Sequence, residues 1–335
     1  MRTCIYGLGA IGGFVAARML EHGLEPTAVV RGRTLEVVRE RGLQLDEGGR
    51  RQSWPLRVAL RADELGVQDV VFVSVKTTAL ADVAAAIGPL IGPDTVIVSA
   101  MNGVPWWFFH GLDATLAAGA PLRSIDPHGA IGAAMPEAQV VGCVVHMAAE
   151  TRGPAQVRHH FGQRFILGDP LQPGSPREAR VAELLRAAKL EVETSARIQR
   201  DVWLKLWGNM TMNPVSALTG ATADRILDDP DALEFMSEAM REAARIGERI
   251  GLPIPMTPEE RHRITRRLGA FRTSMLQDVD ARRPLELDAL VGAVIEIGER
   301  VGVPTPTIRA LMGLARLHAQ TLGLYPMPAA AAPAA

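Results

Sequence analysis

A strongly apolar segment from Asp201 to Ala217 carries three long polar side chains at regular spacing, Lys205, Asn209 and Asn213. Because an α-helix has about 3.6 residues per turn, steps of four place these side chains in one stripe. An ammonium beside two amides could hold an oxygen on which negative charge develops. Polar groups among so many apolar ones need partners, which a polar ligand would supply. The alternative is the solvated face of an amphipathic helix. Pro214 predicts a kink near the end of the segment.

A second segment with chemically useful residues runs from Thr273 to Asp288 and contains Ser274 and Glu286. Pro284 suits the first position of a helix, which would place Glu286 in the first turn. Acidic residues stabilise helix N-termini without any ligand. Glu286 is therefore either a site residue or a helix-stabilising charge, and its sequence neighbours leave both interpretations open.

A glycine-rich turn lies at the start of the chain, where Gly7-Leu8-Gly9-Ala10-Ile11-Gly12 separates an expected strand from an expected helix. In a dinucleotide-binding turn the first glycine permits the tight bend, and the second lets a pyrophosphate approach the backbone. The third allows the helix to pack closely on the strand. The free N–H groups and the positive end of the helix dipole then face the phosphates. The alternative is a tight turn that binds nothing.

The residue after the second expected strand favours one form of the cofactor. A site that prefers NAD usually has an acidic residue there, which accepts hydrogen bonds from the ribose 2′-hydroxyl. This chain has Arg31 at that place, 19 residues after Gly12, with Arg33 close by. A guanidinium can bind a 2′-phosphate with two hydrogen bonds and can stack on adenine. The pattern predicts NADP(H), unless Arg31 is simply a solvated loop residue.

Two further polar residues follow apolar strands. Lys76 comes after the run Val70–Val75, and Asn102 comes after the run Thr95–Ser99. Ligands of open α/β sheets bind beyond the carboxyl ends of the strands. We therefore expect Lys76 and Asn102 to lie along the same crevice as the glycine turn and Arg31. Either residue could instead have a purely local role: Asn102 in a turn, since Asn-Gly is a common turn dipeptide, and Lys76 as a cap at the strand end.

The elements that must position these residues alternate along the first half of the chain. We expect strands at 3–6, 27–30, 70–75 and 95–99. Between them we expect helices at 11–22, after the second strand through about residue 40, and at 78–90. A small hairpin at 43–58 and further strands at 140–168 complete the pattern. Alternation of this kind predicts a doubly wound parallel sheet with right-handed crossovers, the α/β Rossmann type. After about Ser175 the composition turns helical, and apolar residues follow a helical period in 235–250 and 290–301.

The chain length suggests two domains at roughly 150 residues each. We expect a Rossmann-type NADP-binding domain at 1–190, an all-helical domain at 191–326 and a disordered tail at 327–335 rich in Ala and Pro. The sequence has no signal peptide pattern and no apolar run long enough to span a membrane, so we expect a cytoplasmic protein.

Composition argues against several functions. Lys and Arg number 36 against 37 Asp and Glu, a net charge of −1, and aromatic residues make up only 4%. This balance disfavours broad binding to nucleic acid or to a membrane surface, although it allows a local cationic pocket. The eight His and two Cys are scattered, so no metal site is expected. Cys4 and Cys143 lie in apolar runs and are expected to be buried reduced thiols.

Taken in order, the motifs GLGAIGG, VVRG, SVKT, MNGV, WLKLWGNMTMNPVSALT and SMLQDVDARRPLELD resemble those of the ketopantoate reductases, or 2-dehydropantoate 2-reductases, over nearly the whole chain. The last two motifs are far more specific than the glycine pattern. The resemblance implies a Rossmann-type domain followed by a helical domain, as in the 6-phosphogluconate-dehydrogenase-like folds. It implies NADPH-dependent reduction of 2-dehydropantoate to (R)-pantoate on the route to coenzyme A, with cofactor and substrate bound between the domains.

The resemblance also implies roles for single residues. Lys205 would be the catalytic lysine and Glu286 its acidic companion. Asn209 and Asn213 would bind the substrate, with Ser274 at its carboxylate end. Asn102 would lie at the nicotinamide, touching cofactor and substrate, and Arg31 with Lys76 would lie on the 2′-phosphate side.

Other interpretations stay open at this point. The chain could reduce another 2-oxo acid with NADPH, or it could be a catalytically silent regulator that senses NADP(H). A silent regulator would not need the stripe that begins at Lys205. A homodimer is compatible with the apolar helix faces, which could equally form the core of a monomer.

Overall fold

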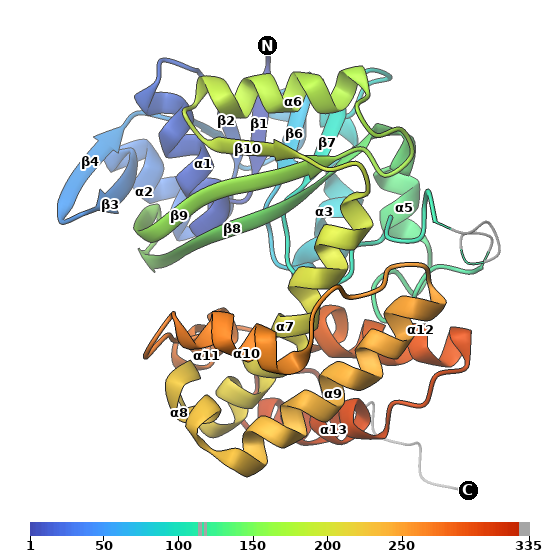
Figure 1. Cartoon of the computed structure of the whole chain (residues 1–335). Coiled ribbons are helices and arrows are strands. Elements are labelled where there is room, and N and C mark those ends of the chain that lie inside the picture. Colours follow the sequence, from blue (N-terminus) through green and yellow to red (C-terminus); the bar gives the residue numbers. More distant parts are fainter. Residues whose placement is uncertain (113–115, 117–118, 328–335) are drawn as a thin grey trace, which may run out of the picture. The chain divides into compact units, whose positions relative to one another are not determined.

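The computed structural model of the chain describes residues 1–112, 116 and 119–327. The expected tail therefore lies outside the described residues, apart from Met327. The chain divides into two compact units, Met1–Val202 and Trp203–Ala335. The first unit is an α/β structure with one sheet of parallel and antiparallel strands, and the second unit is helical (Figure 1).

The sheet unit follows the expected alternation and then extends it. Its elements are β1 (Thr3–Tyr6), α1 (Ala10–Glu21), β2 (Thr27–Val29), α2 (Arg33–Arg41), β3 (Leu43–Glu47), β4 (Arg50–Trp54), β5 (Arg57–Ala59), η1 (Ala62–Glu64), β6 (Val70–Val73), η2 (Thr77–Ala79), α3 (Leu80–Ala86), η3 (Gly88–Leu90), β7 (Val96–Ser99), α5 (Ala130–Ala134), η4 (Glu137–Gln139), β8 (Val140–Gly153), β9 (Gln156–Gly168), α6 (Pro176–Ala187) and β10 (Glu191–Thr194).

The strands form one sheet in the order β4-β3-β9-β8-β7-β6-β1-β2-β5, with β10 paired to β9. The stretch from β8 through β7, β6, β1 and β2 to β5 is parallel throughout. This is the expected doubly wound arrangement. The hairpin expected at 43–58 is only the β3–β4 pair, because β5 leaves it and pairs with β2.

The sheet curls around α1. Strands β4 and β5 lie at opposite ends of the strand order, although only two residues separate them in sequence. The long strands β8 and β9 pair in antiparallel fashion and continue the curvature of the sheet, and β9 also pairs with β3 (Figure 1). On α1 the ring of Phe14 stacks on His159 at 4.6 Å between centroids. A β-carbon on Gly13 would lie 2.6 Å from Val157, so only glycine allows this close packing.

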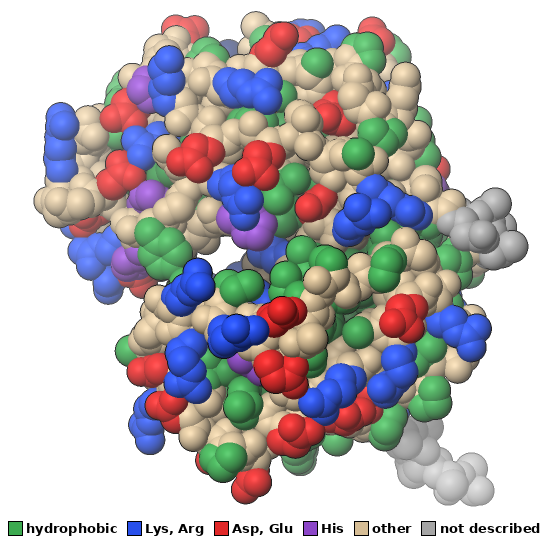
Figure 2. All heavy atoms as spheres, in the orientation of Figure 1, with side chains coloured by type: hydrophobic (Ala, Val, Ile, Leu, Met, Phe, Trp, Pro, Cys, Tyr) green, Lys and Arg blue, Asp and Glu red, His purple; other side chains and the backbone are tan. Residues whose placement is uncertain are grey.

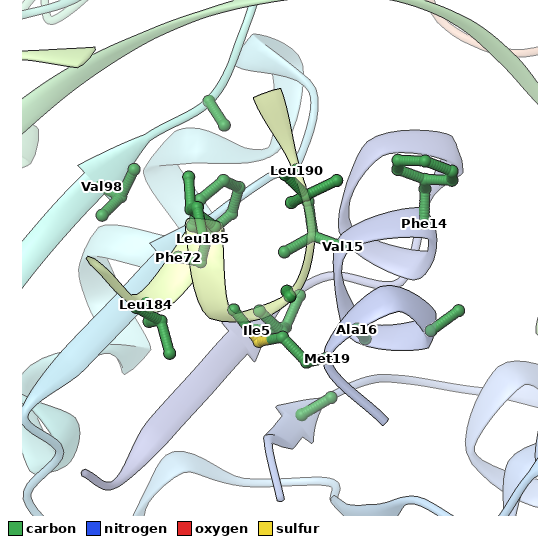
Figure 3. Packing of buried hydrophobic residues seen from close by; sticks show 14 of the residues in the cluster. Ile5, Phe14, Val15, Ala16, Met19, Phe72, Val98, Leu184, Leu185 and Leu190 are labelled. Atoms are coloured by element: carbon green, nitrogen blue, oxygen red, sulfur yellow. The ribbon is translucent and has the colours of Figure 1, made fainter. Parts of the chain in front are cut away.

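One face of the sheet and the helices α1 and α6 share a continuous core. Ile5, Phe72 and Val98 point to this face from three neighbouring strands. Figure 3 shows them packed against Phe14, Val15, Ala16 and Met19 of α1, against Leu184 and Leu185 of α6, and against Leu190. The strands alternate, so Cys4 and Val71 point to the other face. Both cysteines are buried, and burial raises the pKa of the Cys4 thiol to about 12.

The helical composition after Ser175 does not mark the start of the second unit. Helix α6 packs into the core of the sheet, and Glu191–Thr194 forms a tenth strand parallel to β9. The expected all-helical domain at 191–326 therefore includes four residues that belong to the sheet. Edge strand β10 has a mixed sequence, and its partner lies about 27 residues earlier, so no local pattern indicates it.

The helical unit contains two long helices, α7 and α9, and several shorter ones. Its elements are α7 (Ile198–Thr219), which begins in the first unit, then α8 (Ala223–Asp228), α9 (Pro230–Arg249), α10 (Pro258–Arg266), α11 (Ser274–Asp280), the π-helical turn η5 (Asp288–Gly292), α12 (Ala293–Val301) and α13 (Pro306–Thr321). Helix α9 packs against α8, α10, α12 and α13. The indole of Trp207 on α7 donates a hydrogen bond to the carbonyl of Met240 on α9 at 2.7 Å.

Charged side chains are spread over the surface. Figure 2 shows cationic and acidic side chains interspersed on the face in view of each unit. Among the described residues, no helix has both the length and the hydropathy that crossing a membrane requires. In the same residues, His, Cys, Asp and Glu side chains form no group of three that could hold a metal ion.

Candidate cofactor and substrate sites

The register of the sheet unit brings the predicted cofactor residues to one edge. Val29, Tyr6, Val73 and Ser99 lie in one row across β2, β1, β6 and β7. The residues that follow this row are Arg31, the glycine turn, Lys76 and Asn102. The structure therefore places all four predicted features at the same carboxyl edge, where open α/β sheets bind ligands.

The glycine turn is held by the end of β6. The hydroxyl of Ser74 donates to the carbonyl of Gly7 at 2.9 Å. Gly7 has a φ of +95°, which favours glycine. A β-carbon on Gly12 would lie 2.1 Å from both the Gly7 carbonyl oxygen and the Ser74 hydroxyl, so the helix can approach the strand only because this residue is glycine.

Gly9 differs from the other two glycines because its missing side chain leaves space. A β-carbon there would meet nothing closer than the Ser74 carbonyl at 3.9 Å. Gly9 is the N-cap of α1, no side chain caps this helix, and its first turn contains no acidic residue. The first turn thus presents backbone N–H groups and a positive dipole end with room for an anion. These features fit the pyrophosphate of a dinucleotide.

Arg31 lines a pocket of about 280 Å³ within the sheet unit. The pocket is lined by Tyr6, Arg31, Leu60, Arg61, Ala62, Asp63, Asp82, Ala86 and Pro89. The Arg31 guanidinium donates to the carboxylate of Asp82 on α3 at 3.2 Å, and both side chains are largely exposed. Burial raises the pKa of the Tyr6 hydroxyl, while the charge of Arg31 lowers it.

Arg61 is a second cation in this pocket, which the sequence analysis did not identify. It follows β5 and bonds to Asp63 through its guanidinium. No local motif distinguishes an arginine on such a loop. The signal was its position just beyond a strand that pairs with β2, and this pairing becomes visible only in the sheet order.

Lys76 and Asn102 both lie in short connections at the strand ends. Lys76 is the N-cap of η2, and its Nζ atom is shielded from solvent. Asn102 precedes Gly103, whose φ is +85°, as the Asn-Gly pair suggests. The aromatic run after Asn102 belongs largely to the core: Trp107 and Phe108 are buried, and the Trp107 indole donates to Ser99 at 2.7 Å.

In the helical unit, α7 carries the predicted stripe. Lys205 and Asn209 are half-buried on one side of the helix, whereas Trp203, Trp207 and Met210 are fully buried on the other. The stripe is therefore neither a fully solvated face nor part of the core. The helix continues through Pro214 to Thr219, and Asn213 stays helical.

Asn213 connects the stripe to the second segment. Its side-chain amide donates to the hydroxyl of Ser274 at 3.5 Å, although the two residues are 61 positions apart. Asn213 is buried and Ser274, the first residue of α11, is exposed. Thr273 caps α11 by accepting from the Leu276 amide at 3.2 Å, which leaves the Ser274 hydroxyl available to a ligand.

Glu286 does not lie in the first turn of a helix, contrary to the sequence-based expectation. The helical residues begin at Leu287, and the Glu286 carbonyl accepts from the Leu290 amide at 3.2 Å. Pro284 lies outside any helix, and the next residue, Leu285, donates its amide hydrogen to the Leu324 carbonyl at 3.0 Å. Glu286 is half-buried, two residues before the π-helical turn that begins at Asp288, a type of irregularity that is frequent at functional sites.

Both units of the chain match models of one protein family. Residues 3–172 match the family model of ketopantoate reductase PanE/ApbA, and residues 197–319 match the model of its C-terminal domain. The chain belongs to the ketopantoate reductase family. This is a family of NAD(P)-dependent oxidoreductases with a Rossmann-type sheet and a helical second domain.

Individual relatives agree with this assignment. A 2-dehydropantoate 2-reductase of Mesorhizobium japonicum is 41% identical over 326 residues, covering 97% of this chain and 100% of that protein. A crystal structure from Ralstonia solanacearum MolK2, provisionally named a ketopantoate reductase, is 54% identical with a TM-score of 0.93 and covers 97% of this chain and 99% of its own. D-mandelate dehydrogenase, solved with NADH and anilino(oxo)acetate, shares the fold alone, with 20% identity, a TM-score of 0.82, and coverage of 96% and 100%.

Proposed function

We propose that this protein reduces 2-dehydropantoate to (R)-pantoate with NADPH, a step towards coenzyme A. The observation that carries the proposal is the 41% identity, over nearly the full chain, to a protein named for this reaction. Each unit supports it independently. The sheet unit offers a nucleotide-binding edge, and the helical unit offers a half-buried lysine with amides on the same helix.

The choice of NADPH rests on the charges around the Arg31 pocket. Arg31 and Arg61 supply two guanidinium groups that could bind a 2′-phosphate with two hydrogen bonds each, although each is paired with a carboxylate, Asp82 and Asp63. No acidic residue stands at the position of Arg31, where NAD-preferring sites place one. Gly7–Gly12 would hold the pyrophosphate, Lys76 would lie on the 2′-phosphate side, and Asn102 would lie towards the nicotinamide.

When bound, the cofactor supplies the hydride that reduces the ketone carbon. Lys205 stabilises the negative charge that develops on the carbonyl oxygen and donates the proton that completes the alcohol. Glu286 orients the Lys205 ammonium and accepts a hydrogen bond from a substrate hydroxyl. Asn209, Asn213 and Ser274 position the substrate without adding charge. The enzyme would act in the cytoplasm, as a monomer or a homodimer, and needs no metal for these steps.

An NADPH oxidation assay tests the proposal. Purified protein is incubated with 2-dehydropantoate and, in parallel, with a panel of other 2-oxo acids, each with NADPH and with NADH. We expect the highest kcat/KM for 2-dehydropantoate with NADPH. A higher kcat/KM for another acid would reassign the substrate. Tight NADPH binding without turnover of any acid would favour a sensor of NADP(H).

A further inference from the structure

Arg261 is a half-buried arginine of the helical unit whose guanidinium lies against α7. It belongs to α10, and its Nε atom is buried with no hydrogen-bond partner in the part of the chain that the structure describes. Burial lowers the pKa of Arg261, and no carboxylate acts on it in the opposite direction. A half-buried guanidinium with a buried, unbonded Nε and no carboxylate beside it among the described residues is costly, so an anionic partner is expected.

The other arginines of α10 show what the usual arrangement is. Arg263 is exposed over 75% of its side chain and lies 3.9 Å from Glu260. Arg266 forms an ion pair with Asp228 and also donates to the Leu227 carbonyl at 2.6 Å. Arg263 is therefore mostly solvated, and Arg266 is bonded to acceptors of the helical unit. Arg261 alone among these three is directed at the helix that carries the polar stripe.

Gly208 is the residue of α7 that makes room for this guanidinium. A β-carbon at Gly208 would lie 2.6 Å from Nε and 2.7 Å from Nη2 of Arg261. The guanidinium therefore occupies the space that a side chain at position 208 would fill. Every other amino acid at this position would displace it from the helix surface.

The location relates Arg261 to the proposed catalytic lysine. Gly208 follows Lys205 by three residues and directly precedes Asn209, and all three positions are half-buried on α7. Residues three apart on a helix are neighbours, with β-carbons about 5–6 Å apart. The Arg261 guanidinium therefore lies over the face of α7 from which the Lys205 side chain projects, within one helical turn of Lys205.

A 2-oxo acid has two adjacent groups that need different partners. Its ketone oxygen gains negative charge during reduction, whereas its carboxylate is charged from the start. A planar guanidinium is well suited to binding a carboxylate with two hydrogen bonds. We propose that Arg261, held over Gly208, binds the carboxylate of the 2-oxo acid whose ketone faces Lys205. This inference rests on the proposed function, and it assigns Arg261 as a substrate-binding residue that sets specificity for acids.

The proposal is tested with Arg261→Met, Arg261→Lys and, as a matched control on the same helix, Arg263→Met. Loss of a charge-assisted hydrogen bond pair should raise the KM for 2-dehydropantoate by about 10- to 100-fold in Arg261→Met. The KM for NADPH should stay unchanged. Arg261→Lys should lie between the two, because it keeps the charge but not the planar geometry. Arg263→Met should behave like the wild type.

A neutral substrate separates a role in charge recognition from a role in structure. The lactone of 2-dehydropantoate retains the ketone but has no carboxylate. Arg261→Met should lower kcat/KM for the acid and leave kcat/KM for the lactone nearly unchanged. Equal losses for both would overturn the proposal. Calorimetric titration of (R)-pantoate into the protein with NADP⁺ gives a readout without turnover, and the affinity should fall by the same factor.

Gly208→Ala tests the geometry from the other side. The new methyl group should push the guanidinium off the helix, while alanine favours the helix itself. We expect a raised KM for the acid and no further effect when Arg261→Met is added, since both changes remove one interaction. Fully additive effects would contradict the proposal. If the wild type reduces a different 2-oxo acid, the proposed substrate fails, but that acid and its methyl ester still test Arg261.

Discussion

Arg31 and Asp82 form an ion pair of 3.2 Å at the pocket beyond β2, with more than half of each side chain exposed. The pair links the end of the second strand to the helix that follows the β6 strand. Because it is exposed, it contributes little to stability. Its importance lies in the fact that a 2′-phosphate would have to share Arg31 with a carboxylate.

Replacing Asp82 should strengthen NADPH binding. In Asp82→Asn the carboxylate no longer repels the phosphate or occupies Arg31, so we expect the KM for NADPH to fall by a few-fold, on the scale of an exposed charge pair. The KM for NADH should not change. Steady-state kinetics with both cofactors at low and high salt would check this, since the difference should shrink with salt. An increased KM for NADPH would show that Asp82 instead holds Arg31 in place for the phosphate.

Removing Arg31 should affect the two cofactors unequally. Arg31→Ala eliminates a charge-assisted contact to the 2′-phosphate, and we expect the KM for NADPH to rise by about 10-fold or more. The KM for NADH should change little, because that cofactor lacks the phosphate. Arg39→Ala, on the exposed side of α2, is the control for a general loss of positive charge. Equal effects on both cofactors would mean that Arg31 does not recognise the 2′-phosphate.

A methyl group at Gly12 should damage the cofactor turn. It would collide with the Gly7 carbonyl oxygen and the Ser74 hydroxyl, both 2.1 Å from the new carbon. We expect Gly12→Ala to reduce the free energy of unfolding by about 1–3 kcal/mol, the usual cost of overpacking, and to weaken NADPH binding. Urea denaturation and cofactor titration would measure the two effects. Gly88→Ala, where a β-carbon meets nothing within 4 Å, should leave both nearly unchanged.

Lys205→Ala should slow the reaction without disturbing the cofactor. Loss of a positioned acid typically lowers turnover by about 10²–10⁴-fold. The dissociation constant for NADPH, measured by fluorescence titration, should remain close to that of the wild type. Turnover within a few-fold of the wild-type rate would refute the catalytic role of Lys205.

The stability of the helical unit should depend on His262 below neutral pH. Burial lowers the pKa of His262 from its ordinary value of 6.5, Glu259 raises it, and Arg261 and Arg266 lower it further. The His262 Nε2 and the Ser237 hydroxyl are hydrogen-bonded at 3.0 Å. In the unfolded chain this histidine takes up a proton near pH 6.5, whereas in the folded chain it does so only at lower pH. The free energy of unfolding therefore decreases as the pH falls below about 6.5, towards the lower pKa of the folded state.

His262→Gln should reduce this pH dependence. The glutamine has no titrating group, so the difference in free energy of unfolding between about pH 7.5 and about pH 5.5 should be smaller than in the wild type. Urea denaturation at the two pH values would measure it. An undiminished difference would assign the acid sensitivity to other groups.

The local sequence was sufficient where a feature depends on neighbours along the chain. Gly7, Gly9 and Gly12 specify a turn between a strand and a helix through their own conformations and spacing. Lys205 and Asn209 share a helix face because of helix geometry alone. Arg31, Lys76 and Asn102 could be assigned to one edge because parallel strands bring their carboxyl ends together.

Tertiary structure decided the features that depend on partners far away in sequence. Glu191–Thr194 forms strand β10 because it pairs with β9. Strand β5 is not part of the expected hairpin because it pairs in parallel with β2. Glu286 precedes its helix rather than entering it, since the neighbouring Leu285 is held by Leu324. The strand order places Arg61 in the pocket, because β5 lies next to β2. The position of α10 in the helical unit places the Arg261 guanidinium against α7. A long side chain has many rotamers, and only the surrounding fold selects the one in which its charge is placed.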